Sequence, residues 1–189
     1  MDHSRSRSAV LAVVVALSTL LGLAGPAAAA PYCGITWGSL AKTADAPDTE
    51  SLNDVRVGRH ACFDRLVVDV GGQDAWFDSY DVRYVPHVTA EGTGDVVPLR
   101  GGAALQVTVR APAHDAHGNA TFSPVDRREV VDVSSFSTFR QVAWAGSFEG
   151  QSTLGLGVRA RLPFRVLTLA GTPNSDHTPR LVIDVAHRW

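Results

Sequence analysis

A six-residue strand motif occurs twice in this chain, near its two ends. Residues 65–70 read RLVVDV and residues 180–185 read RLVIDV. Every second residue in each copy is apolar and would share one buried face of a strand. A similar short strand precedes each copy, VRV at 55–57 and FRV at 164–166. The sequence therefore predicts two equivalent hairpins, in a pseudo-symmetric sandwich whose halves present the same strand.

Short strand patterns also fill most of the chain between the two copies. Leu105–Val109 alternates apolar and polar residues, which is typical of a half-buried strand. Gly and Pro separate these patterns, and no segment after residue 30 has the apolar spacing of an amphipathic helix. We therefore expect an all-β fold, an antiparallel β-sandwich of two similar sheets with an internal pseudo-repeat. Further strands are predicted at 82–85, 142–148, 154–158 and 164–169.

The N-terminus has the pattern of a secretory signal peptide. Basic residues precede an apolar run, Val10–Leu23, and alanines at 27–30 follow it, as at a cleavage site. The apolar run is shorter than the roughly 20 residues that span a bilayer, although an uncleaved anchor is the alternative. We predict a signal peptide at 1–29 and a single domain at 30–189. The protein would then be secreted, extracellular or cell-wall associated, with no membrane span after cleavage.

Two cysteines, Cys33 and Cys62, are all that the chain contains. Export places them in an oxidising compartment, where a single pair of cysteines usually forms a disulfide. The bond would close a loop of about 30 residues and stabilise the fold by about 3 kcal/mol. The alternatives are two free thiols, or Cys33 as a reactive nucleophile.

The charge balance excludes a typical nucleic-acid-binding protein. The chain has 17 Lys and Arg against 19 Asp and Glu, for a formal net charge of −2. A protein that neutralises a phosphate backbone needs a basic excess. We therefore expect no nucleic-acid partner.

One segment has the residue types of a metal site. His114, Asp115 and His117 lie within four residues, and their side chains are of the kinds that bind metal ions. Gly118 and Asn119 indicate a loop, so we expect a solvated loop, with no metal and no cofactor. The sequence also lacks a G-x-S-x-G nucleophile motif and the spaced zinc ligands of an amidase. It therefore predicts no enzymatic activity.

The charged residues of the repeated motif are candidates for a binding surface. Arg65 and Asp69 in the first copy correspond to Arg180 and Asp184 in the second, and all four should point outward from the sheet. One interpretation is a set of cross-strand ion pairs, each worth a fraction of a kcal/mol. The other is a docking surface for a partner.

Aromatic side chains are the second set of candidates, because sugar rings stack on aromatic faces. Trp76 lies in a predicted loop and is the aromatic residue most expected to be exposed. Trp144 lies in an apolar segment, which favours a place in the core over a contact with a ligand.

The repeated motif has a lead-in, RHACFDR at 59–65, and further characteristic stretches follow at 139–150, 155–157 and 163–166. In these residues the chain resembles the AMIN-like family of secreted actinobacterial proteins and lipoproteins, related to the AMIN domain of cell-wall amidases. The resemblance implies a sandwich of two similar sheets, an envelope-targeting or peptidoglycan-associated role, and no catalysis. Two functions follow as hypotheses. One is a non-catalytic module that binds peptidoglycan; the other is a structural or partner-binding envelope protein that uses an open sheet edge.

Overall fold

The computed structural model describes residues 32–46, 50–71, 76–172, 175 and 177–189. The predicted signal peptide at 1–29 lies outside these residues. The described residues belong to one compact unit, Pro31–Trp189. Its regular elements are β-strands, apart from one short 3-10 turn, η1 (Tyr32–Gly34).

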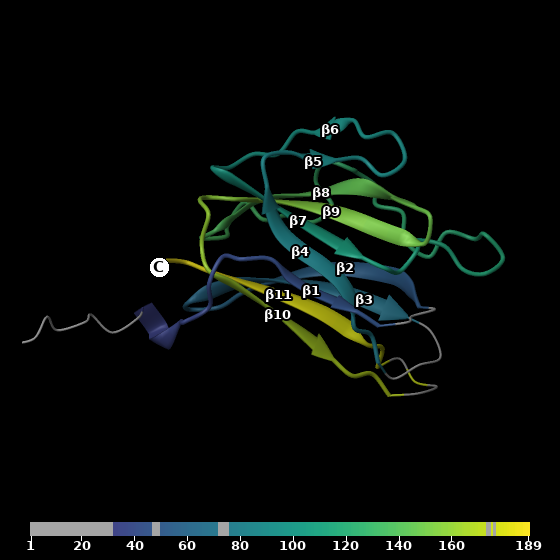
Figure 1. Ribbon diagram of the computed structural model, residues 1–189, viewed down its shortest axis with the longest axis horizontal. Coiled ribbons are helices and arrows are strands. Elements are labelled where there is room, and N and C mark those ends of the chain that lie inside the picture. The colour runs from purple at the N-terminus through teal and green to yellow at the C-terminus, as the bar shows by residue number, and fades with distance from the viewer. Residues whose placement is uncertain (1–31, 47–49, 72–75, 173–174, 176) are drawn as a thin grey trace, which may run out of the picture. The chain divides into compact units, whose positions relative to one another are not determined.

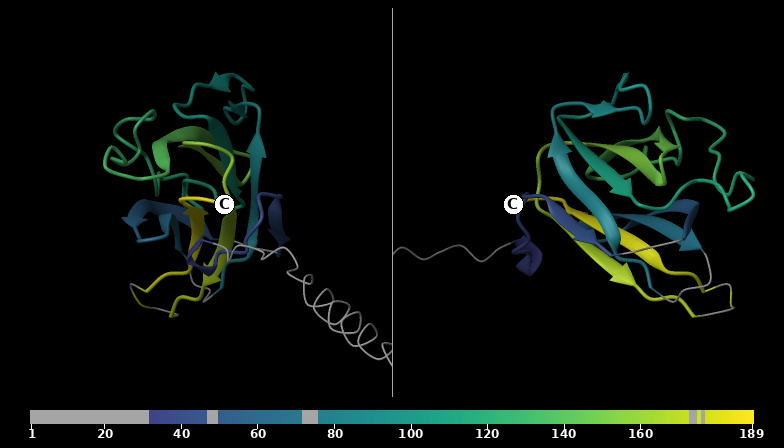
Figure 2. Two further views of the ribbon diagram at one scale, coloured as in Figure 1. Left: turned by 90° about the vertical axis from the view of Figure 1, so that its left-hand side faces the viewer. Right: turned by 45° about the vertical axis from the view of Figure 1, so that its right-hand side comes forward.

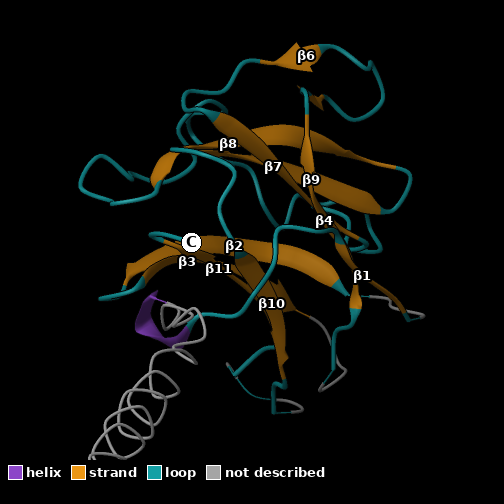
Figure 3. Cartoon of the chain, turned by 60° about the vertical axis from the view of Figure 1, so that its left-hand side comes forward, coloured by secondary structure: helices purple, strands orange, loops and turns teal. Residues whose placement is uncertain are grey.

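The strands form two large antiparallel sheets that face each other across an apolar core (Figures 1 and 3). Sheet A has the order β1 (Lys42–Asp45), β4 (Ser79–Val85), β7 (Ala103–Val109), β9 (Gln151–Val158) and β8 (Phe139–Phe148). Sheet B has the order β10 (Phe164–Leu169), β11 (Arg180–Ala186), β3 (Phe63–Gly71) and β2 (Ser51–Arg59). A small pair, β5 (Val88–Thr89) and β6 (Val96–Val97), lies beside sheet A. The antiparallel β-sandwich predicted from the sequence is confirmed.

The core is built by the alternation along the strands. Leu66 and Val68 of β3 and Leu105 and Val107 of β7 are fully buried and belong to one cluster of apolar side chains. Burial of each such side chain stabilises the fold by about 1.5–3 kcal/mol. Figure 2 shows the two sheets from other directions, as two layers.

The two copies of the repeated motif are neighbours in sheet B. β3 and β11 pair antiparallel, with Arg65 opposite Asp184 and Asp69 opposite Arg180. The sequence suggested that each half of the sandwich presents one copy; instead, the repeat relates the two halves of a single sheet. Alternation specifies which side chains are buried but not which strand lies beside which. A motif with Arg at one end and Asp at the other is complementary to itself when it pairs antiparallel.

The arginines of the two preceding strands occupy different register positions. Arg56 on β2 lies opposite Val67, whereas Arg165 on β10 lies opposite Asp184. Both guanidiniums nevertheless reach the aspartate of the adjacent motif strand. Arg56 Nε lies 2.6 Å from Asp69, and Arg165 Nε lies 2.8 Å from Asp184.

A disulfide between Cys33 and Cys62 ties the N-terminal segment to sheet B, as predicted. Trp37 of this segment packs edge-on against Phe63, with 5.6 Å between the ring centroids. The guanidinium carbon of Arg165 lies 4.4 Å from the Trp37 ring centroid. The tied segment therefore covers one end of the outer face of sheet B.

The connection 110–138 runs along the edges of both sheets. At sheet B, the Leu52 N–H of β2 donates to the Pro112 carbonyl at 2.9 Å. At sheet A, the Trp144 N–H of β8 donates to the Arg127 carbonyl at 2.7 Å. The connection thereby covers these two edges and brings its own side chains beside β8.

Replacement of both cysteines by serine should lower the free energy of unfolding by about 3 kcal/mol, because the unfolded chain regains the entropy of a loop of about 30 residues. Chemical denaturation of the two proteins measures this difference. Wild-type protein unfolded in the presence of a reductant should reproduce the loss. Equal stability of the wild type and the double variant would contradict the prediction.

Candidate functional site

The structure brings the four charged residues of the repeated motif together on the outer face of sheet B. Asp184 accepts two hydrogen bonds from Arg65, at 2.6 and 2.9 Å, and a third from Arg165 at 2.8 Å. These arginines cover Asp184 completely, so its side chain is 0% exposed. The hydrogen bonds from Arg65 to this carboxylate raise the pKa of Arg65.

The second half of this charged set is arranged differently. Asp69 accepts a bidentate pair from Arg56, at 2.6 and 2.7 Å. Arg180 lies opposite Asp69 in the register, yet its guanidinium lies against the His177 ring, at 3.2 Å from Nε2. The geometry therefore accounts for Arg65, Asp69 and Asp184 as members of ion pairs. A ligand-binding role for these residues and for Arg180 stays a prediction.

The two tryptophans predicted as binding residues lie in different surroundings. Trp76 is 71% exposed and precedes β4. Trp144 on β8 is 9% exposed and packs edge-on against Phe122, with 5.2 Å between the ring centroids. Its small exposed part lines a pocket, so Trp144 belongs both to the core and to a candidate binding site.

This pocket, which we call the Trp144 pocket, has a volume of about 600 Å³. Three segments form its walls: the loop after β5 at 90–95, part of the connection at 113–127, and β8 at 144–147. Hydrogen bonds between the segments hold the walls together. The Glu91 N–H donates to the Ala145 carbonyl at 2.8 Å, and the Ala113 N–H donates to Ser147 Oγ at 3.0 Å. The walls of the pocket are therefore held in place by hydrogen bonds of the fold itself.

A glycine shapes the floor of the Trp144 pocket. β8 has a bulge between Trp144 and Gly146, and Gly146 has a φ of 115°, a conformation that favours glycine. A Cβ atom at this position would lie 3.4 Å from Glu91 Cβ and 3.7 Å from Arg127 Nη2. The bare backbone at Gly146 thus lets Glu91 and Arg127 approach from two sides.

Arg127 supplies a cation that is not neutralised. It forms no ion pair with any residue in the described part of the chain. The Glu91 carboxylate, by contrast, accepts hydrogen bonds from Thr153 Oγ1 at 2.6 Å and Gln151 Nε2 at 3.0 Å. The pocket therefore offers an aromatic wall, a free guanidinium and the Asp95 carboxylate.

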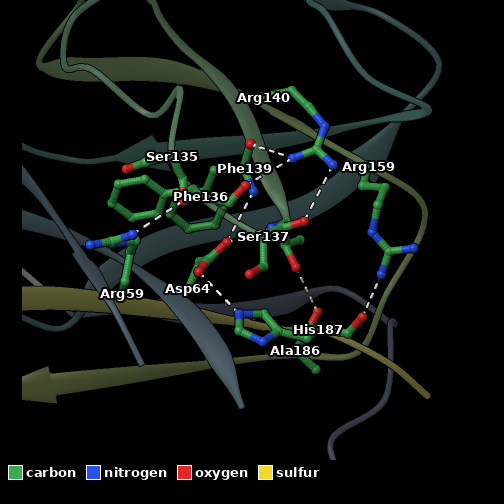
Figure 4. A network of polar contacts seen from close by, with 11 residues as sticks. Arg59, Asp64, Ser135, Phe136, Ser137, Phe139, Arg140, Arg159, Ala186 and His187 are labelled. Atoms are coloured by element: carbon green, nitrogen blue, oxygen red, sulfur yellow. Dashed lines mark hydrogen bonds and ion pairs between the residues drawn. The ribbon is translucent and has the colours of Figure 1, made fainter. Parts of the chain in front are cut away.

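A second polar site surrounds the buried side chain of Asp64 at the start of β3 (Figure 4). One carboxylate oxygen accepts the N–H groups of Thr138 at 2.5 Å and Phe139 at 3.2 Å. The other lies 3.0 Å from His187 Nε2, which donates to it. Asp64 thus joins the first motif strand, the start of β8 and the C-terminal segment.

The sequence did not predict this second site. His60 and His187 are 127 residues apart, and they lie near the two motif copies without equivalent spacing. Asp64 itself belonged to the lead-in that carried the family resemblance. Only the pairing of β3 with β11 brings His60, Asp64 and His187 to one end of sheet B.

The loop at 114–119 uses its carboxylate internally. Asp115 accepts hydrogen bonds from the backbone N–H groups of His117 and Asn119, at 2.8 and 2.9 Å, and from the Asn119 side chain at 2.9 Å. These bonds, the one from the Asn119 side chain first, lower the pKa of Asp115. The described residues contain no group of three or more His, Cys, Asp or Glu that could hold a metal ion.

A known protein family matches most of this chain. The model of the AMIN-like domain family matches residues 50–187, from the start of β2 to the end of β11. The chain belongs to the AMIN-like family. This domain is generally a non-catalytic module, which is consistent with a role at the cell wall. Searches among curated proteins and solved structures find no match to the chain.

The family and the disulfide both point to an extracytoplasmic location. Within the part of this AMIN-like protein that the structure describes, no helix has the length and apolar character needed to cross a membrane.

The substitution Asp64→Asn should lower the free energy of unfolding by about 3 kcal/mol, because an amide cannot accept all three hydrogen bonds at a fully buried site. Chemical denaturation measures the change. Asp81→Asn is the matched control: Asp81 pairs with Arg83 at the surface, where an ion pair contributes little. Equal losses in the two variants would show that Asp64 is not a structural anchor.

Proposed function

We propose that this AMIN-like protein is a non-catalytic, secreted module that binds peptidoglycan at the Trp144 pocket. The observation that carries the proposal is that the unpaired Arg127 guanidinium lines the same pocket as the Trp144 and Phe122 rings. The predicted signal peptide at 1–29 would deliver the protein to the envelope, and the single domain at 30–189 would be the binding module.

The chemistry of the pocket suits a fragment of peptidoglycan. Its glycan strands present sugar rings, which pack on aromatic side chains. Its peptide stems present carboxylates, which guanidinium groups bind through two parallel hydrogen bonds. The Asp95 carboxylate adds an acceptor for hydroxyl, amide or ammonium groups.

The overall charge also favours a local site over a diffuse one. Because the formal net charge is −2, the protein has no general attraction to anionic wall polymers. Binding would then depend on the shape of the pocket and on individual groups such as Arg127. This expectation can be tested with a single neutral substitution.

Arg127→Gln should weaken binding to purified sacculi roughly ten-fold, the loss expected for one charge-assisted hydrogen-bonding group. Co-sedimentation with sacculi over a range of sacculus concentrations gives the apparent affinity. Arg128→Gln is the matched control, because it removes the same charge one residue away and Arg128 does not line the pocket.

Arg128→Gln should bind like the wild type at both low and physiological salt. A wild-type protein that does not pellet at either salt concentration would refute peptidoglycan binding. Equal weakening in the two variants would mean that net charge, and not the Trp144 pocket, governs the interaction.

A second candidate function is supported by the edge strand β10. The Phe164 N–H points away from β11 and donates to the Gly38 carbonyl at 2.9 Å, whereas the Pro163 carbonyl points toward β11 and accepts from Ala186. By alternation, the backbone groups of Val166 and Thr168 also point away from β11. An extended segment of another exported protein could add to sheet B there.

Thr168→Pro tests this alternative, because proline removes an outward N–H that β11 does not use. We expect a stoichiometric partner captured from the secreted fraction to be lost with Thr168→Pro and retained with Thr168→Ala. The two variants must unfold at similar temperatures for the comparison to hold. If the wild type and both variants capture no partner, this result would count against a partner-binding role.

A further inference from the structure

We propose that a cleft beside the Asp64 network binds a phosphate group, at a site separate from the Trp144 pocket. The side chains that line this cleft come from the end of β2, the loop before β8 and the C-terminal segment. They are Arg59, His60, Ser135, Ser137 and His187, with Asp64 at the base. The cleft has a volume of about 620 Å³ and is open to solvent.

The cation in the cleft is available to a ligand. Arg59 is exposed, and it forms no ion pair with any residue that the structure describes. Its guanidinium makes one long hydrogen bond, 3.4 Å from Nη1 to the Ser135 carbonyl (Figure 4). This contact orients the guanidinium toward the cleft wall and leaves most of its N–H groups free.

Beside Arg59, the cleft is lined by hydroxyl and imidazole groups that can form hydrogen bonds. The hydroxyl-bearing side chains of Ser135 and Ser137 lie on exposed residues of the loop before β8. The ring of His60 is held in place by stacking on Phe63, with 4.4 Å between the centroids. A guanidinium, two hydroxyls and a histidine are hydrogen-bond donors of the kinds that bind the oxygens of a phosphate group.

The one carboxylate in the cleft is already occupied. Asp64 is fully buried, and its two oxygens accept from two backbone N–H groups and from His187. Both of its oxygens are therefore already engaged by hydrogen-bond donors of the protein. No other Asp or Glu is among the residues that line the cleft. A tetrahedral anion thus meets donors on several sides, whereas a planar carboxylate would use fewer of them.

Titration of 15N-labelled protein with inorganic phosphate and with a glycerol phosphodiester at constant ionic strength tests the proposal. We expect saturable shifts of the amide signals of residues 59–62 and 135–138. Sodium acetate and sodium chloride should not produce them. Tighter binding of a glycerol phosphodiester would indicate a wall polymer as the source of the phosphate, and tighter binding of inorganic phosphate would indicate the free ion.

Arg59→Gln should weaken phosphate binding at least five-fold, and Ser137→Ala should weaken it by a smaller factor without changing the charge. Arg188→Gln is the matched control, since Arg188 follows His187 directly but lies over the Tyr32 ring, 5.0 Å from its centroid. It should bind phosphate within two-fold of the wild type. Shifts that are equal in chloride, or an Arg59→Gln variant that binds as tightly as the wild type, would overturn the proposal.

Discussion

The pairing of β3 with β11 is the interaction on which the rest of the structure depends. It joins a hairpin from the first part of the domain to a hairpin from its last part, and so closes sheet B around strands more than 100 residues apart. The pairing is favoured on both faces. Leu66 and Ile183 lie opposite each other in the core, and Arg65 and Asp184 lie opposite each other outside it. A slip by one residue would reverse both faces at once.

Buried carboxylates extend this pairing to the neighbouring segments. Asp184 binds Arg165 of β10 as well as Arg65 of β3, and Asp64 binds the start of β8 and the C-terminal His187. Through β8 the constraint reaches the bulge at Gly146 and the wall that carries Trp144. The candidate binding pocket is therefore positioned by the same framework that closes sheet B, although its own polar groups come from loops.

The sequence predicts the parts of this protein that follow from local periodicity. Alternation predicts most of the long strands, and a lone pair of cysteines in a chain with a predicted signal peptide predicts the disulfide. The sequence does not predict which strands are neighbours in a sheet, because a strand such as 65–70 has the same pattern in either half of a sandwich. Phe122 and Arg127 lie in a connection with no periodicity, so only the folded structure places them beside Trp144. His60 and His187 line the same cleft for a similar reason, because the pairing of distant strands brings their segments to one end of sheet B.

The claim that this AMIN-like protein binds peptidoglycan at the Trp144 pocket is tested most directly by mapping the contact surface. Soluble peptidoglycan fragments can be added to 15N-labelled protein while amide shifts are recorded for every residue. We predict that the largest shifts occur at 90–95, 113–127 and 144–147, the three walls of the pocket. Shifts centred on the outer face of sheet B, around Arg65 and Arg180, or no saturable shifts at all, would contradict the account.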